Sequence, residues 1–148
     1  METLGPTGDR WGEDDNARRY DAYAREYPNY REISRDLIAF ALPPGEAGIA
    51  AAAVVDLACG TGATTREIVA VLGPDGKVTG VDQPAAMLGV AATSISDPRA
   101  SWIQARAESA DQHVTGPADA VIGNSAIWQT DVAATAVAVA AVVKAGGR

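Results

Sequence analysis

Two acidic residues and two glycines occupy positions at which an α/β protein can hold a nucleotide. Residues 50–55 form an apolar run that predicts a buried parallel strand, and Asp56 follows this run. The loop containing Gly60 and Gly62 comes next, and residues 63–72 have the apolar spacing of a helix. Glycine lets a ligand approach the backbone closely, and the first N–H groups of a helix are free to bind it. This strand–loop–helix unit therefore predicts a nucleotide-binding corner.

A second carboxylate, Asp82, ends the next predicted strand, residues 77–82, and lies 22 residues after Gly60. A carboxylate about twenty residues beyond the glycine loop, at the end of the neighbouring strand, can accept hydrogen bonds from the hydroxyls of a ribose. Asp82 also precedes Pro84, where a helix is predicted to start, so it could equally cap that helix. The two roles are compatible, and together with the loop they predict a ligand that contains a nucleoside.

The glycine spacing separates two classes of nucleotide-binding protein. The dinucleotide fingerprint has a third glycine where this sequence has Thr65. The pattern Asp56-x-Ala58-x-Gly60-x-Gly62 instead resembles the first motif of the class I S-adenosylmethionine (SAM)-dependent methyltransferases, with Ala58 where glycine is commonest. Further segments resemble later motifs of that family: residues 81–88, 104–108, 118–128 and 142–148.

The resemblance implies SAM as the cofactor and assigns the residues that would contact it. Arg106 stands where the family has an acid that accepts from the adenine amino group, and the backbone of Ala107 would meet a ring nitrogen. The expected cofactor-binding residues are Asp56, Ala58, Cys59, Gly60, Thr61, Gly62, Asp82, Gln83, Arg106, Ala107, Asn124, Ser125, Tyr20 and Tyr27. Tyr30 and Trp128 are expected to contact the methyl acceptor, and no catalytic residue is assigned.

Four tyrosines precede the first strand at helical spacing: Tyr20, Tyr23, Tyr27 and Tyr30. Two helices are predicted here, over residues 17–26 and about 29–42, with Pro28 between them. In one interpretation these helices form a lid over the cofactor, as similar helices do in small-molecule methyltransferases. In the other, the tyrosines pack the helices onto the sheet. The chain accordingly divides into a mobile N-terminus (1–15), a helical lid (16–44) and a SAM-binding core (45–148).

The resemblance also implies a Rossmann-like α/β fold, with parallel strands in the order 3-2-1-4 and helices on both faces. The third and fourth strands are predicted at residues 100–105 and 118–125. The last helix, residues 132–143, is apolar on most sides and is expected to be buried on more than one face. In the family a fifth strand follows the Gly146-Gly147 turn. The expected fold lacks such C-terminal strands, and either a further C-terminal segment or another copy of the chain is expected to cover an unpaired edge of the fourth strand.

Composition excludes several functions. The 148 residues suit one domain, and the formal net charge of −7 argues against non-specific binding to nucleic acid. Cys59 is the single cysteine and His113 the single histidine, which leaves neither an intrachain disulfide nor a typical zinc site. Residues 1–15 lack the apolar core of a signal peptide, and no apolar run reaches the ~18 residues that span a bilayer. We expect a cytoplasmic protein with a small-molecule substrate and no nucleic-acid, membrane or metal partner.

Three functions remain open from the sequence. The first is a SAM-dependent methyltransferase, or its cofactor-binding portion, acting on a small molecule. The second is a non-catalytic methyltransferase-like interaction domain, which the departures at Ala58 and Arg106 keep open. The third, a nicotinamide-dependent oxidoreductase domain, is disfavoured by the missing third glycine.

Overall fold

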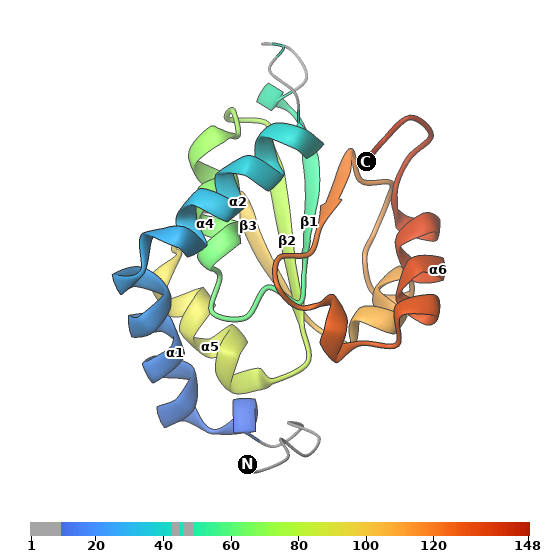
Figure 1. Cartoon of the computed structure of the whole chain (residues 1–148). Helices are drawn as coiled ribbons and strands as arrows, with labels where there is room; N and C mark the ends of the chain where they lie inside the picture. The colour runs from blue at the N-terminus through green and yellow to red at the C-terminus, as the bar shows by residue number, and fades with distance from the viewer. Residues whose placement is uncertain (1–9, 43–44, 46–48) are drawn as a thin grey trace.

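A computed structural model of the chain describes residues 10–42, 45 and 49–148, so most of the expected N-terminal segment 1–15 lies outside the described residues. Four parallel strands form one sheet in the order β3-β2-β1-β4 (Figure 1). They are β1 (Ala53–Leu57), β2 (Lys77–Asp82), β3 (Ala100–Gln104) and β4 (Ala120–Ile122). The strand order and the α/β class predicted from the family resemblance are confirmed.

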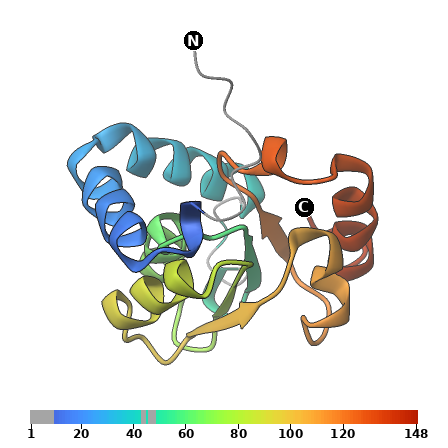
Figure 2. The same cartoon turned by 90° about the horizontal axis from the view of Figure 1, so that it is seen from below.

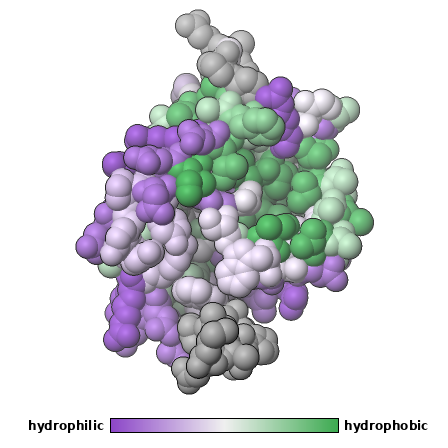
Figure 3. All heavy atoms as spheres, viewed as in Figure 1, coloured by the Kyte–Doolittle hydropathy of each residue, from purple (hydrophilic) through white to green (hydrophobic). Residues whose placement is uncertain are grey.

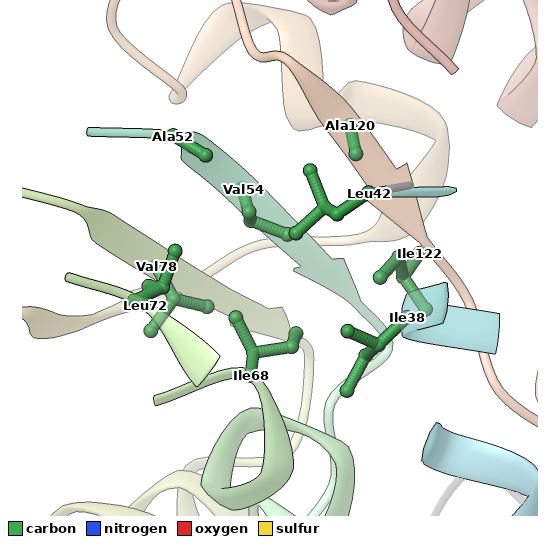
Figure 4. Close-up of a cluster of buried hydrophobic side chains, with 9 residues drawn as sticks. All are labelled: Ile38, Leu42, Ala52, Val54, Ile68, Leu72, Val78, Ala120 and Ile122. Carbon is green, nitrogen blue, oxygen red and sulfur yellow. The ribbon is translucent and has the colours of Figure 1, made fainter. Parts of the chain in front are cut away.

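One face of the sheet is covered by α2 (Pro28–Ala41) and α4 (Ala63–Val71). Ile38 of α2 and Ile68 of α4 pack onto Val54 and Val78, which project from neighbouring strands (Figure 4). Figures 1 and 2 show α1 (Asp14–Glu26) beside α5 (Ala85–Ser94) on the same side of the molecule. Because β1 is buried on both faces of the sheet, residues 50–55 at its start form a nearly continuous apolar run in the sequence.

The opposite face is covered by the 3-10 segment η2 (Ala107–Gln112) and by α6 (Val132–Val142). Val142 and Ala110 pack with Val55 and Val81 of the sheet. Only three residues of α6 are buried, namely Thr135, Ala138 and Val142. The expectation that α6 is buried on more than one face is therefore wrong for the described residues, because the other sides of the helix meet no further element there.

Exposed apolar side chains gather over α2, β4 and α6 in the space-filling view of Figure 3. Phe40 of α2 is 74% exposed and Val137 of α6 is 71% exposed. No helix within the described residues is long and apolar enough to cross a membrane. The exposed side chains of Phe40 and Val137 therefore lie on short helices that flank the sheet.

The outer edge of β4 was expected to be unpaired, and the structure corrects this. The N–H of Arg148 donates to the carbonyl of Asp119 at 3.1 Å, and the N–H of Val121 donates to the carbonyl of Arg148 at 2.8 Å. Ala118 also forms a parallel bridge with Val143. The C-terminal residues therefore lie along the first part of this edge, because the turn after α6 returns them to the start of β4.

The N-terminal helices begin earlier than the sequence predicted. Arg10–Gly12 form the 3-10 turn η1 and α1 begins at Asp14, within the segment expected to be mobile. The reason is an aromatic contact: the Trp11 ring packs edge-on against Tyr20 with centroids 5.3 Å apart. This contact brings η1 to the edge of the sheet at which the strands have their carboxyl ends, which faces the viewer in Figure 2.

Candidate functional site

The loop between β1 and α4 has an unusual backbone conformation. Ala58, Gly60 and Gly62 all have left-handed φ angles, of 55°, 57° and 84°. A Cβ at Gly62 would lie 2.7 Å from the Cδ1 of Ile95 and 3.2 Å from the Trp102 ring, and together with the left-handed φ this favours glycine at the position. Ala58 adopts the left-handed region in spite of its methyl group, which costs on the order of 1 kcal/mol. The loop therefore keeps this shape in spite of backbone strain at Ala58.

Asp82 holds the loop against the end of β2. Its Oδ2 accepts the N–H of Gly60 at 2.5 Å, and its Oδ1 accepts the N–H of Gln83 at 2.7 Å. Burial raises the pKa of Asp82, and these two N–H groups oppose that shift. The alternative role as a helix cap is not seen, because α5 begins after Pro84 without a side-chain cap. The carboxylate instead joins the ends of two adjacent strands.

Asp56 is buried beneath this loop, with 1% of its surface exposed. Its Oδ2 accepts a hydrogen bond from the Thr65 hydroxyl of α4 at 2.5 Å. Burial raises the pKa of Asp56 to about 7, and the nearby charge of Asp82 acts in the same direction. The Thr65 hydroxyl opposes the shift. Asp56 therefore links β1 to α4 and titrates close to neutral pH.

A cavity of about 580 Å³ opens at the carboxyl ends of the strands, beside this loop. Such a volume is typical of a small-molecule or cofactor site. Ten of the residues expected at the site line it: Tyr20, Ala58, Gly60, Asp82, Gln83, Arg106, Ala107, Asn124, Ser125 and Trp128. Six do not line it: Asp56, Cys59, Thr61, Gly62, Tyr27 and Tyr30. Asp56 lies beneath the loop, while Cys59, Thr61 and Gly62 are buried residues of the loop itself, and Tyr27 and Tyr30 belong to the N-terminal helices. Ligand contact by any of the sixteen stays a prediction.

Eight further residues line the cavity. Ala126 was expected near the methyl acceptor together with Ser125 and Trp128, and seven were not assigned to the site from the sequence: Trp11, Pro84, Met87, Ala105, Glu108, Gln129 and Thr130. Some carried a detectable signal. β2 ends at Asp82 as predicted, and Pro84 lies two residues beyond it, whereas Ala105 was predicted as the last residue of the third strand, which ends at Gln104. No local sequence pattern indicated that Trp11 and Thr130 line the cavity, because they reach it through the packing of η1 and of the segment after β4.

Two roles were considered for the four tyrosines, contact with the cofactor and packing of the helices, and the structure places them differently. Tyr20 lines the cavity, while Tyr30 packs edge-on against its ring with centroids 6.2 Å apart. Tyr27 instead contacts Tyr23, with centroids 4.3 Å apart, and both are just under half exposed. Burial, followed by the neighbouring Tyr30 and the two aspartates, raises the pKa of Tyr20 to about 12. Tyr20 therefore presents a protonated phenol beside the cavity.

Arg106 and Glu108 form the far wall of the cavity. The guanidinium of Arg106 donates to Glu108 at 3.3 Å, and Glu108 also accepts the N–H of Asp131 at 2.8 Å. Asp131 in turn caps α6 by accepting the N–H of Ala134. The wall is thereby fixed to the start of α6, although the Arg106 side chain is 63% exposed.

Metal chemistry and histidine chemistry gain no support from the described residues. No group of three or more His, Cys, Asp or Glu side chains in the described part of the chain could hold a metal ion. His113 is exposed at the end of η2 and does not line the cavity. The described arrangement can bind and orient a ligand through backbone N–H groups, Asp82 and aromatic rings.

A parallel 3-2-1-4 sheet with a glycine loop and a strand-end carboxylate at its carboxyl edge is the arrangement expected of a class I methyltransferase core, and dinucleotide-binding folds share it. Comparison with protein families agrees: residues 54–147, more than half of the chain, match the family described as "Methyltransferase domain". The chain belongs to this family. The comparison with curated proteins gives no match.

Solved structures share the fold at low sequence identity. A protein of Methanococcus maripaludis, assigned as a SAM-dependent methyltransferase, superposes with a TM-score of 0.73 at 19% identity, over 99% of this chain and 64% of that one. A SAM-dependent methyltransferase of Thiobacillus denitrificans, in complex with S-adenosyl-L-homocysteine, gives 0.59 at 20% identity, over 77% and 45%. Fibrillarin of Aeropyrum pernix, with natively bound SAM, gives 0.58 at 18% identity, over 66% and 43%. The chain thus spans less than two thirds of the length of these proteins.

Proposed function

We propose that this chain binds SAM in the cavity beside Gly60 and Asp82 and serves methyl transfer to a small-molecule acceptor. The observation that carries the proposal is the bond between the Gly60 N–H and Asp82 Oδ2 at the cavity wall. It brings a glycine loop and a strand-end carboxylate together, which is the arrangement that holds the ribose of a nucleoside. Two structurally similar proteins hold SAM or its demethylated product, S-adenosyl-L-homocysteine.

The residues present fit such a ligand. Asp82 uses one hydrogen bond on each carboxylate oxygen within the protein, and each oxygen retains a lone pair for a ribose hydroxyl. Ala58 and Gly60 line the cavity with little side-chain bulk, so a ligand can approach their backbone. A bound SAM would supply a methyl group on a positively charged sulfur. The rings of Tyr20 and Trp128 lie at the same cavity and can stabilise that charge.

Methyl transfer from a sulfonium depends chiefly on alignment of the acceptor with the methyl group. The segment after β4, with Ser125 and Trp128, lines the cavity together with Trp11 of η1. These residues therefore form a wall against which an acceptor can be oriented and shielded from water. A small molecule suits this cavity, and the net charge of −7 disfavours a polynucleotide.

Calorimetry with SAM, S-adenosyl-L-homocysteine and NAD tests the proposal. Both sulfur-containing nucleosides are expected to bind, and NAD is expected to bind more weakly because Thr65 replaces the third glycine of the dinucleotide loop. Stronger binding of NAD would support a nicotinamide-dependent oxidoreductase instead. Absence of binding by all three ligands would favour a non-catalytic interaction domain.

A further inference from the structure

A buried hydrogen-bond network joins three elements that are far apart in the sequence. Ser34 of α2 is fully buried, Thr64 near the start of α4 is 5% exposed, and Asn124 follows β4. The Oγ of Ser34 lies 2.9 Å from the Oγ1 of Thr64. The Nδ2 of Asn124 donates to both hydroxyl oxygens at 3.2 Å. The segment after β4 is therefore tied to the N-terminal helices and to the helix that follows the glycine loop.

The hydrogens of this network have one consistent arrangement. Ser34 donates its hydroxyl hydrogen to the carbonyl of Tyr30 at 2.8 Å, so it accepts from Thr64 and from Asn124. Thr64 gives its single hydroxyl hydrogen to Ser34 and accepts from Asn124. The Nδ2 of Asn124 is then the donor that both hydroxyl oxygens accept from. Rotating the amide by half a turn would direct its oxygen at two oxygens that have no hydrogen left to give.

The other end of the Asn124 amide fixes the cavity wall. Its Oδ1 accepts the hydroxyl of Ser125 at 2.9 Å, and Ser125 has a left-handed φ of 57°. The carbonyl of Ser125 accepts the indole N–H of Trp128 at 3.0 Å. Ser125 and Trp128 both line the cavity, whereas Ser34 and Thr64 do not. A chain of hydrogen bonds thus runs from a buried pair of hydroxyls to the indole at the cavity.

We propose that Asn124 is a positioning residue, which, through Ser34 and Thr64, sets the conformation of the Ser125–Trp128 turn and so the acceptor wall. This inference rests on the proposed function for the meaning of that wall. A buried polar network specifies a single arrangement only when every member has its partner, so loss of one hydroxyl releases the turn.

The test follows Trp128 by fluorine NMR in protein labelled with 5-fluorotryptophan. The chain has three tryptophans, and loss of one resonance in Trp128→Phe assigns the Trp128 signal. Thr64→Val keeps the shape of the side chain and removes the hydroxyl, while Thr64→Ser keeps the hydroxyl and removes a methyl group. Thr64→Val and Ser34→Ala are expected to shift or broaden the Trp128 resonance, and Thr64→Ser to leave it at the parental position.

Two further measurements, a second resonance and a ligand affinity, are needed to interpret the result. Trp102 lies on β3, at the opposite edge of the sheet from β4, and its resonance is expected to stay in place in all folded variants. The affinity for S-adenosyl-L-homocysteine is expected to stay within about fivefold of the parent in Thr64→Val and Ser34→Ala, since neither residue lines the cavity. An unmoved Trp128 signal in Thr64→Val overturns the inference, as does an equal shift in Thr64→Ser, and so does a larger loss of affinity.

The same experiment separates this inference from the function on which it rests. If the parent protein binds no S-adenosyl-L-homocysteine, the proposed function fails. The response of the Trp128 resonance to Thr64→Val and Thr64→Ser then still decides whether the network sets the turn. If Ser34→Ala does not fold, the Thr64 pair alone gives the answer.

Discussion

The backbone N–H of Gly60 donates to Oδ2 of Asp82 over 2.5 Å, and this bond ties the loop after β1 to the end of β2. The N–H of Cys59 reinforces it by donating to the carbonyl of Val81 at 3.1 Å. Asp82 thereby has two tasks in one position. It shapes the glycine loop, and it presents a carboxylate to the cavity.

Replacement of Asp82 is expected to weaken binding of S-adenosyl-L-homocysteine. Asp82→Ala removes both the acceptor for the Gly60 N–H and the acceptors for ribose, and hydrogen bonds to a charged group contribute about 1.5–3 kcal/mol, so calorimetry should show a loss of roughly tenfold to hundredfold. Asp82→Asn keeps the size, loses the charge and should fall in between. Asp75→Asn, in an exposed turn, is the matched control. Parental affinity in both Asp82 variants would limit Asp82 to a structural role.

Asp56 is expected to make stability depend on pH. Its pKa is about 7 in the folded protein, against about 3.9 for an unfolded aspartate, so the folded state binds the proton more tightly. This contribution to the free energy of unfolding is fully present below about pH 4 and is lost as the pH rises to about 7, by up to about 1.4 kcal/mol per pH unit. Asp56→Asn removes that part of the slope.

Urea unfolding of the parent and of Asp56→Asn, at several pH values between about 5 and 8, measures the effect. Asn can still accept the hydrogen bond from the Thr65 hydroxyl, so the variant keeps this link between β1 and α4. All other titrating groups are common to both proteins and cancel in the comparison. Equal slopes for parent and variant would mean that Asp56 is ionised in the folded protein throughout this range.

Ala58→Gly is expected to stabilise the fold. The left-handed φ of 55° costs an alanine about 1–2 kcal/mol, and glycine avoids this cost but gains about 0.4–1 kcal/mol of freedom in the unfolded state. The net gain is about 0 to 1.6 kcal/mol in the free energy of unfolding. Ala92→Gly, at an exposed position of α5, should destabilise by about 0.8–1 kcal/mol. Equal destabilisation by both substitutions would contradict the strain assigned to Ala58.

Tyr20 is expected to be the tyrosine that affects the ligand. Tyr20→Ala removes part of the cavity wall and should weaken binding of S-adenosyl-L-homocysteine by about tenfold. Tyr20→Phe keeps the ring against Trp11 and should bind within about threefold of the parent. Tyr23→Ala, at a position just under half exposed, serves as the control. If Tyr20→Ala binds as the parent does, α1 and α2 only pack against the rest of the fold and form no lid.

Local sequence features were sufficient to predict β2, while the order of the strands was predicted from the family resemblance. The bounds of β2 (Lys77–Asp82) match the prediction, because Asp75 and Gly76 mark the turn before it and Asp82 ends its apolar alternation. The fourth strand was predicted too long. It ends at Ile122, because Gly123 and Asn124 lead into a left-handed turn at Ser125 that no local pattern signals.

Features that depend on the packing of distant segments could not be read from the sequence. The contact between Ser34 and Asn124 joins residues 90 positions apart, and it exists only because α2 crosses the sheet beside β4. The place of Trp11 at the cavity likewise depends on how η1 packs against Tyr20. Residue type alone gave no reason to place either contact.

The central claim, that the loop containing Gly60 receives the nucleoside, is tested most directly by calorimetry with S-adenosyl-L-homocysteine on a pair of glycine variants. Gly60→Val introduces a branched side chain at a φ of 57° on the cavity wall, while Gly116→Val introduces the same strain at a φ of 81° with no atom within 4 Å and away from the cavity. We expect the parent and Gly116→Val to bind, and folded Gly60→Val not to bind. Binding of parental strength by a folded Gly60→Val protein would contradict the claim.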